Sequence, residues 1–173
     1  AKYSGALLRS AAREVATAVG REVRLQAEGL PRVPAAYAGV VKDICIQMIR
    51  NSICHGIEPP EERAVAGKSR GGTVRVVFVD QGVDDYGLTV EDDGHGLDYE
   101  QILDRALRDG LLKPEQAMQL DRASIFRLIF HPGFTTATTV SEHAGRGVGL
   151  DVVTAMIRER GGRIGVSTAP GQY

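Results

Sequence analysis

The stretch of sequence that decides the fold is Gly145-Arg146-Gly147-Val148-Gly149-Leu150-Asp151-Val152-Val153. Glycines at every second position leave backbone N–H groups free to approach an anion closely. The apolar residues that follow recur at helical spacing, so the predicted helix points its positive N-terminal end toward the same place. The stretch predicts a loop that wraps phosphate groups, although glycine clusters also mark plain turns.

Two common phosphate-binding motifs are excluded. A Rossmann fingerprint needs G-x-G-x-x-G after a strand, which differs from the alternate glycines here. Gly67-Lys68-Ser69 is similar to the end of a P-loop, but Glu62 stands where the leading glycine of that motif should be.

Composition and charge limit the class of protein. The chain has 173 residues, 43% hydrophobic and 25% charged, which suffices for a core and predicts a single domain over residues 1–173. With 21 basic and 22 acidic residues the formal net charge is −1, so neither nucleic acid nor an anionic membrane is indicated as a partner. No apolar stretch approaches the ~20 residues that span a bilayer, and the first residues lack a signal-peptide pattern, so we expect a cytoplasmic protein. Cys45 and Cys54 point to different sides of one predicted helix, which argues against a disulfide.

The apolar pattern predicts a chain of helices and strands. Helices are expected over residues 5–19, from 34 past 53, over 99–108, over 122–130 and from 150 to about 160. Strands are expected at 23–25, 73–79, 88–91 and 163–167.

Three connecting segments have compositions typical of turns and loops. Residues 84–87 predict a hairpin turn, and residues 57–72 predict a loop with at most one short helical piece. The Thr- and Gly-rich stretch from 130 to 145 lacks apolar periodicity and is long enough to be a mobile lid over a site.

One face of the long helix is polar. Gln47, Asn51 and His55 recur at every fourth residue, which stacks their side chains on one helical face, with Arg50 beside them. A solvated surface is the plain explanation for such a trio. A neutral amide such as that of Asn51, however, suits a divalent cation bound to phosphate oxygens.

A second polar cluster, Glu91-Asp92-Asp93-Gly94-His95-Gly96, directly follows a predicted strand. A carboxylate at a strand end can accept a hydrogen bond from an exocyclic amino group, and the glycines let the backbone approach a flat ring. A tight turn with an incidental acidic pair is one alternative. Calcium binding by Asp92, Asp93 and Asp98 is another, although the twelve-residue spacing of such loops is absent.

Together and in this order, these motifs resemble the GHKL ATPase superfamily of gyrases, heat-shock chaperones, histidine kinases and mismatch-repair ATPases. The similarity is closest to the catalytic domain of CheA-like, chemotaxis-type histidine kinases, and it covers nearly the whole chain. The segments that carry it are residues 50–59, 91–96, 130–136 and 140–149. The resemblance implies the Bergerat fold, an α/β two-layer sandwich whose mixed, mostly antiparallel sheet is covered by helices.

The resemblance also implies ATP and Mg²⁺ as cofactors and gives roles to matching residues. Asn51 would hold Mg²⁺ between the phosphates, and Arg50 and His55 would approach the phosphate tail. Asp92 would accept a hydrogen bond from the adenine amino group. The other implied nucleotide-binding residues are Gly94, Gly96, Thr136, Gly145, Arg146, Gly147, Val148 and Gly149.

The implied activity is transfer of the ATP γ-phosphoryl group to a histidine on a phosphotransfer domain. Positioning and charge neutralisation dominate such catalysis. A coupling or adaptor protein and a response regulator are the further partners implied, and the domain would be part of a larger multidomain kinase.

Two residues depart from the family pattern and leave alternatives open. The family usually has a histidine at position 47, proposed as a base toward the acceptor, and the amide of Gln47 cannot take a proton. Cys54 replaces a usual aspartate. One alternative is a nucleotide-sensing module that binds ATP without transfer. A GHKL protein serine kinase is another, against which the run His55-Gly56-Ile57-Glu58-Pro59 argues.

Overall fold

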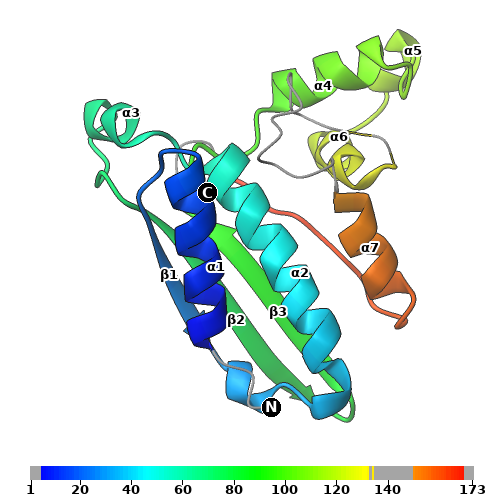
Figure 1. The fold of residues 1–173 in the computed structure, drawn as a ribbon. Coiled ribbons are helices and arrows are strands. Elements are labelled where there is room, and N and C mark those ends of the chain that lie inside the picture. The colour runs from blue at the N-terminus through cyan, green and yellow to red at the C-terminus, as the bar shows by residue number, and fades with distance from the viewer. Residues whose placement is uncertain (1–4, 133, 135–149, 170–173) are drawn as a thin grey trace. The chain divides into compact units, whose positions relative to one another are not determined.

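The computed structural model describes residues 5–132, 134 and 150–169 (Figure 1). The chain divides into two compact units, the first reaching His95 and the second beginning at Gly96. The single functional domain expected over residues 1–173 stays a prediction. No helix of the described residues is long and apolar enough to cross a membrane.

The first unit places helices on one face of a mixed three-stranded sheet (Figure 1). β1 runs parallel to β2, and β3 runs antiparallel to β2. This confirms the expected α/β fold with a mixed sheet covered by helices. The elements are α1 (Gly5–Ala18), β1 (Val23–Glu28), η1 (Leu30–Arg32), η2 (Ala35–Tyr37), α2 (Ala38–Asn51), η3 (Ser52–Gly56), α3 (Pro60–Val65), β2 (Gly72–Gly82) and β3 (Asp85–Asp92).

Residue alternation along the strands sets the core of this unit. Every second residue of β2, Val74, Val76 and Phe78, is buried in the core, as the period of two in a strand requires. Helical spacing does the same for α1, whose apolar stripe is stopped by Gly20 in the left-handed region at φ 68°. The buried helix residues are Leu8, Ala12, Ala16, Val41, Cys45 and Ile49.

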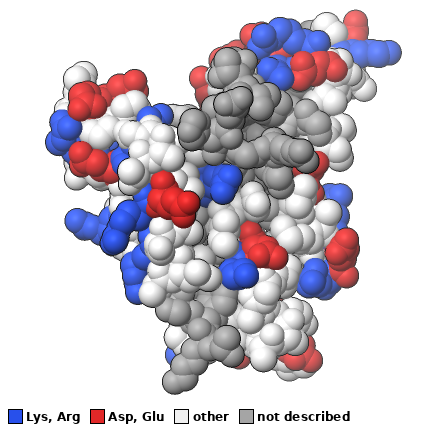
Figure 2. All heavy atoms as spheres, in the orientation of Figure 1, with Lys and Arg blue, Asp and Glu red and all other residues white. Residues whose placement is uncertain are grey.

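The other face of the sheet carries the charged side chains Arg75, Glu28 and Glu91 beside the apolar Val77 and Val79 of β2. Arg75 of β2 forms ion pairs with Glu28 of β1 at 3.2 Å and Glu91 of β3 at 3.1 Å. These side chains are exposed, so the pairs contribute little stability but keep this face hydrated. Basic and acidic side chains also lie side by side around α3 (Figure 2).

The hairpin between β2 and β3 turns earlier than the expected segment 84–87. Val83 and Asp84 form the turn with positive φ values of 34° and 55°, and β3 begins at Asp85. Tyr86 lies in the strand because its ring stacks on Phe78 at 5.6 Å and packs against Tyr37 at 5.7 Å. Aromatic packing therefore extends the ladder beyond the residues whose composition suggested a turn.

The second unit is helical in its described residues. Its core contains Ile102, Ala106, Ile125, Ile129 and Phe134. Helices were expected where α4, α6 and α7 lie, and these predictions are confirmed. The elements are α4 (Tyr99–Arg108), α5 (Pro114–Ala117), α6 (Arg122–Phe126), η4 (Arg127–Phe130) and α7 (Leu150–Arg158).

The prediction of a strand at residues 163–167 is wrong, because the structure has no strand between residues 159 and 169. Ile164 and Val166 alternate with small and polar residues, but a strand requires a neighbour to complete its hydrogen bonds. The described residues of the second unit supply no such neighbour. The Leu97 N–H instead donates to the Thr168 hydroxyl at 2.9 Å.

Candidate functional site

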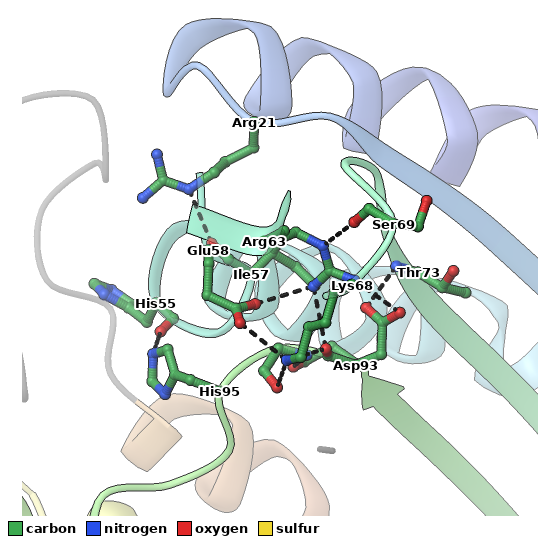
Figure 3. Close-up of polar contacts among 12 residues, drawn as sticks. Arg21, His55, Ile57, Glu58, Arg63, Lys68, Ser69, Thr73, Asp93 and His95 are labelled. Carbon is green, nitrogen blue, oxygen red and sulfur yellow. Dashed lines mark hydrogen bonds and ion pairs between the residues drawn. The ribbon is translucent and has the colours of Figure 1, made fainter. Parts of the chain in front are cut away.

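The polar helix ends in an irregular turn that breaks its regular spacing. α2 stops at Asn51, and Ser52–Gly56 continues as a π-helix in which the Ile57 N–H donates to the Ser52 carbonyl at 2.8 Å. Arg21 closes this turn, because its Nε donates to the Ile57 carbonyl at 2.9 Å (Figure 3). π-turns inside helices are frequent at functional sites.

The π-turn changes where the predicted residues lie. Gln47 and Asn51 are half-buried on α2, whereas His55 is exposed beyond its end. The four-residue spacing that predicted a shared face therefore applies to Gln47 and Asn51 only. Arg50, next to Asn51, is also half-buried.

The turn at Gly56 packs directly on residues 92–95 of the second polar cluster, which we call the acidic loop. A Cβ on Gly94 would overlap the carbonyl group of Gly56, so only glycine fits at position 94. The His95 N–H donates to the Gly56 carbonyl at 3.1 Å, and His95 Nε2 lies 2.6 Å from the His55 carbonyl oxygen (Figure 3). These contacts hold two sequence-predicted motifs together.

Asp92 lies at this junction. Its Oδ1 accepts the Gly94 N–H at 3.0 Å, and a Cβ on Gly56 would lie 2.8 Å from each carboxylate oxygen. Among the described residues, no second donor reaches the Asp92 carboxylate. The half-buried Asp92 is therefore held on one side and retains hydrogen-bonding capacity for a ligand.

Asp93 has a different environment from its neighbour. Its Oδ1 accepts the Thr73 N–H at 2.8 Å, and its Oδ2 pairs with Arg63 Nη2 at 3.1 Å. Asp93 therefore anchors the loop to β2 and to the segment after Ile57. Asp98 in turn accepts the Gln101 N–H at 3.1 Å as the N-cap of α4. The described residues contain no group of three or more His, Cys, Asp or Glu arranged for a metal, so the calcium alternative gains no support.

A buried arginine connects the segment around α3 to the acidic loop (Figure 3). Arg63 is 1% exposed, and its guanidinium donates to Glu58 at 2.9 Å, to the Asp93 carbonyl at 3.1 Å and to the Ser69 carbonyl at 2.7 Å. Lys68 Nζ donates to Glu58 Oε2 at 2.9 Å. The sequence did not predict this network, because Arg63 in α3 and Asp93 after β3 are 30 residues apart in the sequence.

Charge in this network affects the ionisation of Glu58. Burial acts to raise the pKa of the Glu58 carboxyl, but hydrogen bonds, first from Lys68, and the charges of Lys68 and Arg63 lower that pKa below its usual value. A carboxyl whose pKa is lowered by folding stabilises the folded state above its ordinary pKa. This contribution is lost as the pH falls through the lowered pKa.

Glu58→Gln is therefore expected to weaken the acid sensitivity of folding. At neutral pH it should lower the free energy of unfolding by about 1.5–3 kcal/mol, the cost of losing hydrogen bonds to a charged group. The difference from the native protein should shrink below the ordinary pKa of a glutamate, where the unfolded chain takes up the proton, and its charge-dependent part should be lost as the pH falls through the lowered pKa of the folded state. Urea titrations across pH measure this. Glu61→Gln, in an exposed pair with Arg70, is the control, and a constant Glu58→Gln difference across pH would contradict the assignment.

Two neighbouring groups near the π-turn are neutral at pH 7. Desolvation, and after it the charge of His95, lowers the pKa of the His55 imidazole. Burial raises the pKa of the Cys54 thiol, against the charges of Arg50 and Arg21, which lower it. Cys54 therefore adds no negative charge to this turn, unlike the aspartate usual in the resembling family.

The remaining predicted site residues lie elsewhere. Gly96 belongs to the second unit and has a φ of 76°, a conformation that favours glycine. Of the expected lid over residues 130–145, residues 130–132 and 134 are described, and Phe134 is buried in the core of the second unit. The rest of that stretch and the alternate glycines lie outside the described residues, as do Thr136, Gly145, Arg146, Gly147, Val148 and Gly149.

Comparison with known proteins identifies the family. Residues 40–173 match the model of the histidine kinase-, DNA gyrase B- and HSP90-like ATPase family. This chain belongs to that family of ATPase domains, which implies ATP binding.

Curated relatives are similar over most of this chain. A gliding motility regulatory protein of Myxococcus xanthus is 40% identical over 94% of this chain and 21% of its own length. The chemotaxis protein CheA of Bacillus subtilis is 43% identical over 76% of this chain and 20% of its length. The sensor histidine kinase CheAY of Helicobacter pylori is 34% identical over 92% of this chain. The chain spans about a fifth of the length of these relatives.

Solved structures also align with this chain. A histidine kinase domain from the blue-light activated kinase of Erythrobacter litoralis EL346 covers 56% of this chain and 41% of its own, at 24% identity and a TM-score of 0.37.

Proposed function

We propose that this chain is the ATP-binding catalytic domain of a CheA-like histidine kinase. Its activity would be transfer of the ATP γ-phosphoryl group to a histidine on a phosphotransfer domain. The observation that carries the proposal is Asp92, held by Gly94 and packed on Gly56, in a chain of this ATPase family. Similarity to CheA proteins over most of the chain supports the kinase class.

Asp92 is proposed to select the base. A half-buried carboxylate with unused acceptor capacity suits the exocyclic amino group of adenine. Gly94, whose missing Cβ lets the loop pack on the Gly56 carbonyl, would fix this carboxylate, and Gly96 would be a further nucleotide-binding glycine. Gly56 contributes by leaving the space that the Asp92 carboxylate occupies.

Asn51 is proposed to hold Mg²⁺, and the residues present fit that ion. The Asn51 amide oxygen is a neutral, hard ligand in a half-buried place. When bound, Mg²⁺ neutralises charge on the β- and γ-phosphates. Arg50 and neutral His55 would donate to the phosphate tail. We propose the same tail as the target of Thr136, Gly145, Arg146, Gly147, Val148 and Gly149.

The surrounding system is also a proposal. We infer that residues 1–173 act as one functional domain of a larger multidomain cytoplasmic kinase, since the similar CheA proteins are several times longer. The partners would be a phosphotransfer domain, a coupling or adaptor protein and a response regulator. A membrane surface or nucleic acid is not proposed as a partner.

Single-turnover transfer tests the kinase proposal. The native protein, saturated with Mg²⁺ and γ-labelled ATP, should label a CheA-type phosphotransfer domain, and Asn51→Ala should not. A native protein that binds ATP but labels no phosphotransfer domain would contradict kinase activity. That result would favour the nucleotide-sensing alternative. The observation behind this alternative is that the Gln47 amide cannot remove a proton from the acceptor.

Gln47→His is expected to speed this transfer without changing ATP affinity. An amide can orient the acceptor but cannot remove a proton, whereas histidine can, and general base catalysis typically contributes ~10²–10⁴-fold. The gain should stay at or below that range, because a neutral imidazole acceptor already offers a lone pair. Rates and affinities are measured together. Full rescue of an otherwise inactive protein would show that position 47 must carry a base.

A further inference from the structure

We propose that Lys68 is a positioning residue for base selection: it fixes the main chain that aims the Asp92 carboxylate. The inference rests on the proposed binding of ATP at Asp92. It assigns a specificity role to the segment around α3, which lies outside the four segments that carry the family resemblance.

The Lys68 ammonium group donates hydrogen bonds to the acidic loop. Nζ donates to the Asp93 carbonyl at 3.0 Å, to the Gly94 carbonyl at 2.8 Å and to Glu58 Oε2 at 2.9 Å (Figure 3). These three acceptors match the three donors of an ammonium group. Two of them are main-chain carbonyls of the residues that directly follow Asp92.

Gly94 transmits this anchoring to Asp92. Its carbonyl accepts from Lys68, while its N–H donates to Asp92 Oδ1 at 3.0 Å. The same residue packs against the Gly56 carbonyl without room for a Cβ. Lys68 thus anchors the acidic loop beside the π-turn, and through Gly94 it sets the orientation of the Asp92 carboxylate.

Arg63 and Lys68 differ in burial, so a role in positioning can be distinguished from a role in folding. Arg63 is 1% exposed and pairs with both Glu58 and Asp93, so it supplies the buried centre. The Lys68 side chain is 20% exposed and lies at the margin. Removing its ammonium group leaves the Arg63 contacts and the packing of Gly94 in place.

The test compares two nucleotides that differ only in the base amino group. Calorimetry gives the affinities of the native protein, Lys68→Met and Arg70→Met for ATP and for purine riboside triphosphate, which lacks the 6-amino group. Lys68→Met should lower the ratio of ATP to analogue affinity by about tenfold, since small displacements of positioning groups have effects of this size or larger. Arg70→Met, in an exposed ion pair of the same loop, should keep the native ratio.

The possible outcomes distinguish a failure of the Lys68 role from a failure of the proposed ATP binding at Asp92. A native protein that binds neither nucleotide contradicts the proposed ATP site itself. A native protein that prefers ATP, with an unchanged ratio in Lys68→Met, overturns the positioning role alone, even if the variant unfolds at a lower temperature. If Lys68→Met does not fold, Glu58→Gln, which weakens the hold on Lys68, should lower the ratio by about threefold, and an unchanged ratio again overturns the role.

Discussion

Arg63→Ala is expected to lower the free energy of unfolding by about 3–5 kcal/mol, the range for removing one partner of a buried ion pair. The guanidinium is almost fully buried and holds two carboxylates and two main-chain carbonyls. Without it, and among the described residues, the Glu58 carboxylate would keep only its ion pair with Lys68, and the Asp93 carboxylate would keep only the Thr73 N–H.

Urea unfolding of the native protein and the variant measures this loss. Arg70→Ala removes a guanidinium from the same segment, but its pairs are exposed, so a loss below about 1 kcal/mol is expected. Equal losses in the two variants would contradict a stabilising role for the buried network.

Asp92→Ala is expected to weaken ATP binding by roughly one to two decades. A hydrogen bond to a charged group contributes ~1.5–3 kcal/mol, which converts to that range of affinity. Calorimetry with ATP and Mg²⁺ measures it. Glu91→Ala is the matched control, because Glu91 is adjacent on β3 but pairs with Arg75 on the other face of the sheet. Equal affinities of native and Asp92→Ala proteins would remove Asp92 from the site.

Local patterns predicted most of the fold. Helical spacing located α1, α2, α4, α6 and α7, and alternation located the three strands of the sheet, because these signals depend on neighbours in sequence. The strand expected at 163–167 fails for the opposite reason. Alternation describes one strand, whereas pairing depends on a partner that the pattern cannot specify.

The candidate site was predictable in its residue types but not in its construction. The acidic cluster predicted a ligand-binding carboxylate, and alternation along β3 separates the two acids, since Asp92 pairs with buried Val74 and Asp93 is the next residue. The π-turn could not be predicted, because the helical period continues unchanged through His55. The Arg63 network joins residues distant in sequence, so it became visible only in the fold.

The location of the nucleotide is tested most sharply by an NMR titration of isotope-labelled protein with Mg²⁺ and a non-hydrolysable ATP analogue. The largest amide shift changes among the described residues are expected at 51–56 and 92–95, where Gly56, Asp92 and Gly94 meet. Arg75 and Glu28 on the other face of the sheet should remain nearly unchanged. Saturable binding that leaves 51–56 and 92–95 unperturbed would contradict an adenine nucleotide site built on Asp92.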